Sequence, residues 1–256
     1  ILSLIQGITE FLPVSSSSHL IIFSKFIDFS EQSLSIDLSL HIGSFIAVLV
    51  YFKKDIINFV KNKKLFLKIL IASIPVMGSG YFLLKTNLIE SLRNIEVIGW
   101  ATIIFGILLF ISDKFKINKS IKRDLNYKSA LFIGLFQILS LIPGVSRMGI
   151  TITASRFQNF NRYDASKISF LLSIPVLGVI TIYGLNNLLT SGDLSVSILD
   201  FFSIFLAFIF SIFTIKFFLQ YVRRFNLNFF VGYRLVPVSY THLRAHETGR
   251  NGVCRV

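Results

Sequence analysis

The chain has 256 residues, a mean hydropathy of +0.71 and only 15% charged residues. Apolar runs of about 20 residues, the length needed to cross a bilayer, recur along it, so the composition predicts a polytopic membrane protein. The net charge of +13 does not indicate nucleic-acid binding, because the basic residues are clustered between the apolar runs, as the positive-inside rule requires. The single cysteine, Cys254, excludes disulfides within the chain and cysteine-based metal sites.

The first segment, Ile1–Phe26, is apolar at both ends and polar in the middle. The chain opens inside it without an initiator Met or a signal peptide, and we expect a short N-terminal stretch to precede it. Pro13 and the four serines at 15–18 disfavour a continuous helix. The segment is therefore predicted to form two half-helices joined by a loop.

Three apolar spans and a second interrupted segment are expected next. The spans are Leu38–Phe52, Leu65–Leu84 and Val97–Ile111. The second interrupted segment, Ser129–Arg156, is broken at Pro143-Gly144. Two further spans, Ile168–Leu189 and Phe201–Phe218, follow, and Asn228–Val236 has the composition of the start of a last one. The pattern predicts an all-α fold.

The charges between the spans predict how the chain is oriented in the membrane. Residues 53–68, 113–128 and 156–167 are rich in Lys and Arg and are predicted to be cytoplasmic, whereas 190–200 contains two Asp and no basic residue. This alternation places the first interrupted segment on the external side and the second on the cytoplasmic side. Both are predicted to be re-entrant hairpins.

The two interrupted segments also share a sequence pattern. Gln6 precedes Leu12-Pro13-Val-Ser, and Gln137 precedes Ile142-Pro143-Gly-Val-Ser. Because the segments enter from opposite sides, we predict two inverted repeats, each containing a re-entrant helix–loop–helix hairpin. Residues 1–237 are assigned to this membrane domain, and the hydrophilic stretch 238–256 is interpreted as a non-native tail.

Gln6 and Glu10 are candidate metal ligands. They lie four residues apart, so they share one face of a helix. Their oxygens can hold one hard cation, with water or a substrate phosphate completing the shell. The alternative is that Glu10 only caps or hydrogen-bonds within the loop. We favour the functional interpretation, because an ionisable side chain inside a bilayer is costly.

Ser15, Ser16 and His19 follow directly. At least one of the serines at 15–18 is expected to cap the second half-helix, because Ser is a preferred N-cap residue. A helix N-terminus also attracts anions, so these hydroxyls are candidate phosphate contacts. His19 is a candidate acid or base, with a purely structural role as the alternative.

Arg147 is the most distinctive residue of the second run, Pro143-Gly-Val-Ser146-Arg147-Met-Gly-Ile-Thr151. An arginine between apolar half-helices needs an anion, and its planar fork suits phosphate. The alternatives are an arginine that extends to the membrane interface and an ion pair with Glu10. Ser146 and Thr151 either add hydroxyl contacts to the anion or cap the helix.

If the two hairpins meet at their tips, a carboxylate, an imidazole, hydroxyls, an arginine and two helix N-termini converge at membrane depth. This set is typical of phosphoryl chemistry, in which a metal and an arginine neutralise charge. A site inside the membrane implies a substrate that resides there, which is a lipid phosphate or diphosphate. Membrane lipids are the other expected partners.

At this point the residues match a known family. The run from Gln6-Gly-Ile-Thr-Glu10-Phe-Leu-Pro-Val-Ser-Ser to His19, together with Pro143-Gly-Val-Ser-Arg147-Met-Gly-Ile-Thr151, resembles the two signature motifs of the bacterial undecaprenyl-diphosphatase (bacitracin-resistance protein) family. The resemblance extends from about Ile1 to Arg234. It implies hydrolysis of undecaprenyl diphosphate to undecaprenyl phosphate and inorganic phosphate. This reaction recycles the carrier lipid for peptidoglycan synthesis and confers bacitracin resistance.

The resemblance also implies the roles of individual residues. Glu10 matches an essential carboxylate, which with Gln6 would hold a divalent cation, Mg²⁺ or Ca²⁺. His19 matches a conserved histidine, Ser16 a hydroxyl proposed as nucleophile or phosphate contact, and Arg147 the phosphate-binding arginine. The nucleophile stays open between Ser16, His19 and a water molecule. Met148 stands where the family usually has Ser, so no hydroxyl role is expected there.

The resemblance further implies a location in the bacterial cytoplasmic membrane, with the active site toward the external face. A homodimer is compatible with this interpretation. The competing hypothesis is a transporter or flippase for a polyprenyl phosphate, because inverted repeats with broken helices are typical of secondary transporters. A binding-only or structural role has no support in the sequence.

Overall fold

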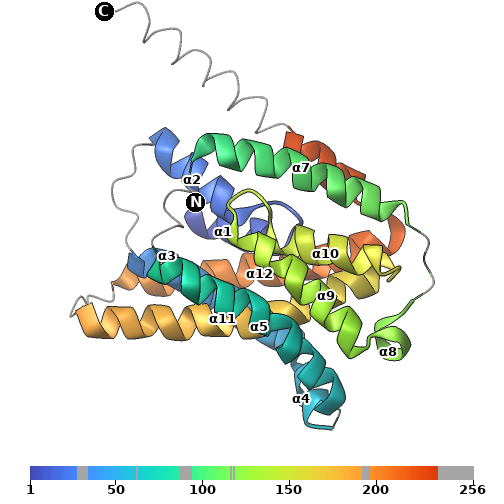
Figure 1. Ribbon diagram of the computed structural model, residues 1–256. Helices are drawn as coiled ribbons and strands as arrows, with labels where there is room; N and C mark the ends of the chain where they lie inside the picture. The colour runs from blue at the N-terminus through green and yellow to red at the C-terminus, as the bar shows by residue number, and fades with distance from the viewer. Residues whose placement is uncertain are drawn as a thin grey trace, which may run out of the picture.

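The structure is a computed structural model that describes residues 1–27, 34–61, 63–86, 94–115, 117, 119–191 and 197–235. Within these ranges the chain forms helices and no strand, apart from one isolated bridge between Lys119 and Phe160 (Figure 1). The predicted all-α class is therefore confirmed. The tail assigned to 238–256 lies outside the described residues, as does the end of the last predicted span.

Both interrupted segments are broken where the prolines predict. The first consists of α1 (Leu2–Thr9) and α2 (Ser16–Ile27), and the second of α9 (Tyr127–Ile138), the 3-10 turn η1 (Leu139–Leu141) and α10 (Arg147–Phe157). Serines cap the second half-helix of each pair. The Ser15 hydroxyl accepts from the Ser18 amide at 3.4 Å, and the Ser146 hydroxyl accepts from the Gly149 amide at 3.1 Å.

Among the described residues, four helices are long and apolar enough to cross a membrane: α5 (Lys63–Lys85), α7 (Ile95–Asp113), α11 (Arg162–Ser191) and α12 (Ile198–Arg224). The helix α3 (Leu34–Tyr51) is apolar but shorter. These helices confirm a polytopic membrane protein. The relation of its two halves as inverted repeats stays a prediction.

The helices extend beyond the apolar runs that predict them. For example, α11 begins at Arg162 rather than near Ile168, because the Asn161 side chain accepts from the Asp164 amide at 2.8 Å and caps the helix earlier. Two short helices, α4 (Lys53–Lys61) and α8 (Ile121–Asp124), lie in the basic stretches 53–68 and 113–128. These stretches were predicted only to be cytoplasmic. Lys and Arg are good helix formers, so a basic loop need not be irregular.

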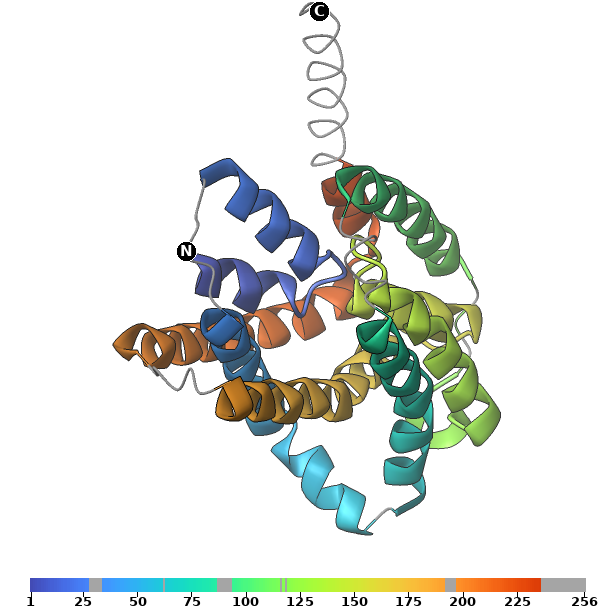
Figure 2. The same ribbon diagram turned by 60° about the vertical axis from the view of Figure 1, so that its left-hand side comes forward.

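Small residues allow the first hairpin and α3 to approach α12 closely. A Cβ added at Gly7 of α1 would lie 2.6 Å from the Phe210 Cβ, and one at Gly43 of α3 would lie 2.8 Å from the Ala207 Cβ. Such contacts are characteristic of helix packing in membranes, where small residues let backbones approach. In Figure 2, α1 and α3 (blue) lie against α12 (orange).

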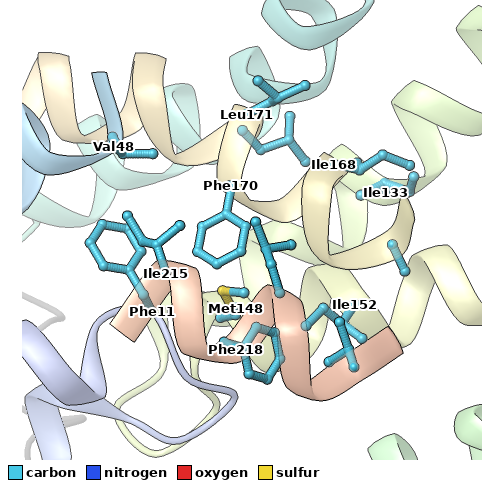
Figure 3. Close-up of a cluster of buried hydrophobic side chains, with 14 of the residues drawn as sticks. Phe11, Val48, Ile133, Met148, Ile152, Ile168, Phe170, Leu171, Ile215 and Phe218 are labelled. Carbon is cyan, nitrogen blue, oxygen red and sulfur yellow. The ribbon is translucent and has the colours of Figure 1, made fainter. Parts of the chain in front are cut away.

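The main hydrophobic core includes the first loop and residues of α10, α11 and α12. Phe11, from the first loop, tilts against Phe170 of α11 with ring centroids 5.7 Å apart, and Phe170 contacts Phe218 of α12 edge-on at 6.2 Å (Figure 3). Met148 of α10 is fully buried in the same cluster. Met148, which stands where the family usually has Ser, therefore packs in the core.

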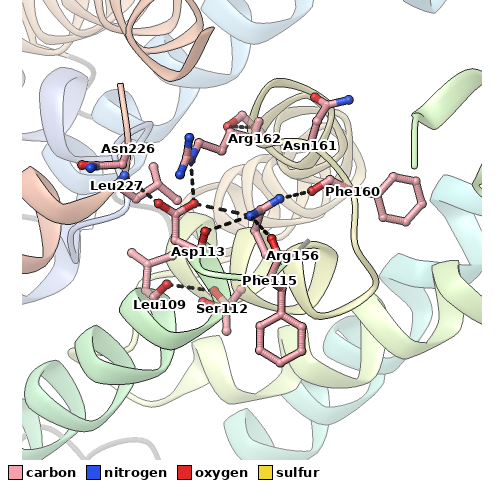
Figure 4. Close-up of polar contacts among 12 residues, drawn as sticks. Leu109, Ser112, Asp113, Phe115, Arg156, Phe160, Asn161, Arg162, Asn226 and Leu227 are labelled. Carbon is pink, nitrogen blue, oxygen red and sulfur yellow. Dashed lines mark hydrogen bonds and ion pairs between the residues drawn. The ribbon is translucent and has the colours of Figure 1, made fainter. Parts of the chain in front are cut away.

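A buried ionic network lies at the C-terminal end of α7 (Figure 4). The Asp113 carboxylate, at the end of α7, lies 2.7 Å from Arg162 Nε and 3.4 Å from Arg156 Nε, and it accepts from the Leu227 amide at 3.1 Å. The side chain of Arg156 is fully buried and donates to the backbone carbonyls of Asp113, Phe115 and Phe160. The network joins α7, the α10–α11 turn and the segment after α12.

Asp113→Asn is expected to lower the free energy of unfolding by about 3 kcal/mol, because it leaves two arginines without their carboxylate. The measurement is the thermal unfolding temperature of the purified protein in detergent. Asp55→Asn is the matched control, since the Asp55–Lys167 pair is partly exposed and such pairs contribute less than about 1 kcal/mol. Equal shifts for both variants would contradict the structural importance of the network.

Candidate active site

The tips of the two hairpins meet. The Gly144 amide in the second loop donates to the Ser15 hydroxyl in the first loop at 3.3 Å. Gly144 has φ +99°, and a Cβ there would lie 2.6 Å from the Ile98 carbonyl oxygen, so this tight turn requires glycine. In Figure 2 the blue loop after α1 and the yellow-green loop before α10 lie side by side near the centre of the molecule.

Arg234 fastens the two tips to each other. Its Nε donates to the Pro13 carbonyl at 2.6 Å, and its Nη2 donates to the Val145 carbonyl at 2.9 Å. The side chain comes from the helical residues 228–235, and Arg234 is only 2% exposed. A planar guanidinium suits this task, because its donors point in fixed directions toward two acceptors at once.

Glu10 and Arg147 form an ion pair across the junction of the loops. Arg147 Nη2 lies 2.8 Å from Glu10 Oε1, and the two side chains are 13% and 8% exposed. The alternative recognised from the sequence, a salt bridge between these residues, is thus the arrangement in this structure. Each charge provides the counter-ion that the other needs away from water.

The other oxygen of Glu10 accepts two more hydrogen bonds. The Ser16 hydroxyl donates to Glu10 Oε2 at 2.8 Å, and Gln6 Nε2 donates to the same atom at 3.1 Å. Four residues predicted for the site, Gln6, Glu10, Ser16 and Arg147, therefore form one connected group.

A cavity of about 580 Å³ opens onto this group. Its polar lining comes from both hairpins and from α3: Gln6, Glu10, Ser15, Ser16, Ser17, Asp37, His41, Ser140, Ser146 and Arg147. Its apolar lining includes Leu20 of α2, Val76 of α5 and Leu177 of α11. A cavity that is polar at the ion pair and apolar on the surrounding helices suits an amphiphile with a charged head.

The remaining predicted hydroxyls divide into two groups. Ser15 and Ser146 line the cavity, although both hydroxyls also cap helices. Thr151 is fully buried, its hydroxyl lies 2.6 Å from the Ser169 hydroxyl, and it does not line the cavity. The Thr151 hydroxyl also donates to the Arg147 carbonyl at 2.9 Å, so the structure places Thr151 in the support of α10.

His19 also lies outside the cavity lining. Its Nδ1 is 2.6 Å from the Ser15 carbonyl, and its Nε2 is 2.9 Å from the Tyr233 hydroxyl, with the two rings stacked at 5.7 Å between centroids. The imidazole thus holds the first loop against residues 228–235. The structure does not bring it into contact with Glu10.

Four residues at or near the site were not predicted from the sequence: His41, Asp37, Tyr233 and Arg234. His41 and Asp37 are four residues apart on α3 and line the cavity, and His41 Nδ1 is 3.2 Å from Gln6 Nε2. The signal was present, because these are polar groups within an apolar helix, the same criterion that identified Gln6 and Glu10. Arg234 meets the same criterion, because it is a charged residue within the last predicted apolar span.

The donor set around Glu10 limits how a metal could be held. Within the described ranges no three His, Cys, Asp or Glu side chains are grouped to hold a metal ion. Gln6 Oε1, however, is buried and has no hydrogen-bond partner there. A carboxylate and an amide oxygen fit Mg²⁺, which is commonly held by one or two protein ligands together with substrate phosphates and water.

Comparison with known proteins identifies relatives along most of the chain. The family model described as "Bacitracin resistance protein BacA" matches residues 1–238. The chain is 49% identical over 237 residues to an undecaprenyl-diphosphatase of Pelagibacter ubique (strain HTCC1062), and the match covers 92% of each chain. It is 41% identical over 191 residues to an undecaprenyl-diphosphatase of Ruegeria sp. (strain TM1040), covering 69% of this chain and 71% of the relative.

The geometry predicts the effect of Arg234→Lys. An ammonium group cannot reach both loop carbonyls as a guanidinium does. Amide hydrogen exchange in loops 10–15 and 142–146 is therefore expected to become faster in both loops together. Arg224→Lys, at the exposed end of α12, is the control and is expected to leave this exchange unchanged. Unchanged protection in Arg234→Lys would show that the tips are held together without this side chain.

Proposed function

Because the chain belongs to the bacitracin resistance protein BacA family, we propose that it is a membrane phosphatase that hydrolyses undecaprenyl diphosphate to undecaprenyl phosphate and inorganic phosphate. This reaction recycles the carrier lipid for peptidoglycan synthesis and confers bacitracin resistance. The observation that carries the proposal is the Glu10–Arg147 ion pair at the polar end of a cavity with apolar helical walls. The names of the relatives support the same substrate.

The proposed location is the bacterial cytoplasmic membrane, with the active site toward the external face. The alternation of basic and acidic connections supports this orientation. The apolar lining of the cavity would accommodate the first part of the prenyl chain, and the rest would lie among membrane lipids.

In the proposed mechanism the diphosphate binds by displacing Glu10 from Arg147. The Arg147 guanidinium offers its donors in a fork that matches phosphate oxygens. The diphosphate therefore replaces Glu10 as the counter-ion of Arg147. Ser15 and Ser146 line the cavity beside it and can add hydroxyl contacts. Glu10 thereby becomes free to act on a proton or on a cation.

A divalent cation held by Glu10 and Gln6 Oε1 would neutralise charge on the diphosphate. Glu10 Oε2 lies 2.8 Å from the Ser16 hydroxyl, so the carboxylate can accept the proton of Ser16 or of a water molecule at that position. Attack of the water molecule on the terminal phosphorus breaks its bond to the bridging oxygen, which leaves with the lipid monophosphate, and inorganic phosphate is formed directly. Attack of Ser16 breaks the same bond but gives a phosphoserine, which a water molecule must then hydrolyse to release inorganic phosphate and restore the hydroxyl. His19 stays a predicted acid or base, and its observed contacts support a second role in positioning Ser15.

Substitution of the ion pair tests the site. Glu10→Gln and Arg147→Lys are each expected to lower kcat/KM for undecaprenyl diphosphate by at least about 100-fold, because each removes a group that stabilises charge in the transition state. Phosphate release from purified protein in detergent is the measurement, and unfolding temperatures show whether each variant folds. Arg123→Lys, which is largely exposed, is the control. Normal release by a folded ion-pair variant would overturn the site assignment.

Removal of the metal is a separate test. EDTA is expected to abolish phosphate release by the wild-type protein, and excess Mg²⁺ or Ca²⁺ is expected to restore it, because the charge of a diphosphate needs a cation beyond Arg147. Full activity in EDTA would exclude the cation from the mechanism. The absence of release under all metal conditions would instead favour the competing hypothesis of a polyprenyl-phosphate transporter.

A further inference from the structure

The cavity contains an imidazole that the proposed mechanism does not use. His41 projects from the middle of α3 and lines the cavity together with Glu10 and Arg147. Its Nδ1 is 3.2 Å from Gln6 Nε2, and Gln6 Nε2 is 3.1 Å from Glu10 Oε2. A carboxylate, an amide and an imidazole thus form a continuous chain of contacts that ends inside the cavity.

The chain of contacts determines which nitrogen of His41 carries the proton. Glu10 is ionised beside Arg147 and can only accept hydrogen bonds, so the Gln6 side chain must turn its NH₂ group toward it. The same NH₂ group faces His41 Nδ1, and an NH₂ group can only donate. Nδ1 is therefore the acceptor in the neutral ring, and the hydrogen is on Nε2.

The Nε2–H group is the one left for a ligand. Within the described ranges no protein group hydrogen-bonds to His41 Nε2, whereas both nitrogens of His19 are already engaged by Ser15 and Tyr233. The His41 side chain is only partly buried, on the cavity side of α3. Because His41 lines the cavity, the nitrogen that does not contact Gln6 is the one that a ligand there can reach.

We propose that His41 is a catalytic residue that donates a hydrogen bond from Nε2 to a phosphate oxygen of the substrate. This inference rests on the proposed function, because the ligand is the same lipid diphosphate. Arg147 of α10 and His41 of α3 both line the cavity, so a diphosphate bound there can be contacted from two elements. A neutral donor suits this position, because it stabilises an anion without adding another buried charge. No proton is transferred by His41 in this role.

Two substitutions separate this role from structural support. A Gln side chain places an NH₂ group near the position of Nε2, so His41→Gln keeps a donor for phosphate but loses the contact with Gln6. An Asn side chain reaches only the position of Nδ1, so His41→Asn keeps an acceptor for Gln6 but loses the phosphate donor. His41→Asn is expected to lower kcat/KM by about 10- to 100-fold, whereas His41→Gln retains most of it.

Binding is measured in parallel with a prenyl methylenediphosphonate, which cannot be hydrolysed. Its Kd is expected to rise about tenfold in His41→Asn and to change little in His41→Gln. Tyr51→Phe, at the C-terminal end of α3, is the control for perturbation of this helix. Unfolding temperatures are recorded for all variants.

The opposite order, with Asn the better replacement, would overturn the proposal in favour of structural support for Gln6. Wild-type activity in both variants would overturn it as well. Equal large losses in two folded variants would also overturn it, because they would require the imidazole itself for proton transfer. If the wild-type protein binds the analogue but releases no phosphate, the proposed function fails, while the binding series still tests His41.

Discussion

The ion pair between Glu10 and Arg147 is the interaction on which the rest of the structure depends. The two residues are 137 positions apart and lie on different hairpins, and neither charge could remain buried without the other. The fold must therefore bring two broken helices together at their tips. Gly7 and Gly43 let α1 and α3 pack closely on α12, and Gly144 lets the second loop pack on α7, so a larger residue at any of these positions would shift the elements that position the site.

Arg234 adds a second buried cation at the same junction, and its partners are carbonyl oxygens rather than a carboxylate. Its Nη1 has no hydrogen-bond partner in the part of the chain that the structure describes. The junction of the loops thus contains two guanidinium groups, those of Arg147 and Arg234, of which Arg147 is paired with the Glu10 carboxylate. This imbalance favours a ligand that carries negative charge, and the surrounding low-polarity helices strengthen its effect. The side chain that fastens the loops therefore also contributes to the attraction of the substrate.

The sequence predicted the helices and the two breaks well, because prolines, serines and long apolar runs are local signals. It also predicted that Glu10 and Arg147 would converge, since charged groups inside a membrane need partners. It did not predict that α3 adds polar residues to the cavity, nor that His19 lies outside the cavity lining. His19 adjoins the serines in sequence yet turns toward Tyr233, whereas His41 lies far along the chain and faces Gln6. The direction of a side chain depends on how helices pack, and no local pattern records that packing.

The resting ion pair also gives a reason for a diphosphate to bind and a monophosphate to leave. A ligand must compete with Glu10 for Arg147, and it succeeds only if its own charge and contacts exceed those of a carboxylate at 2.8 Å. A lipid diphosphate carries more negative charge and can contact Arg147 and His41 together. After cleavage each product carries a single phosphate, so fewer contacts oppose the return of Glu10. Re-formation of the ion pair would then compete with each product for Arg147 and favour its release.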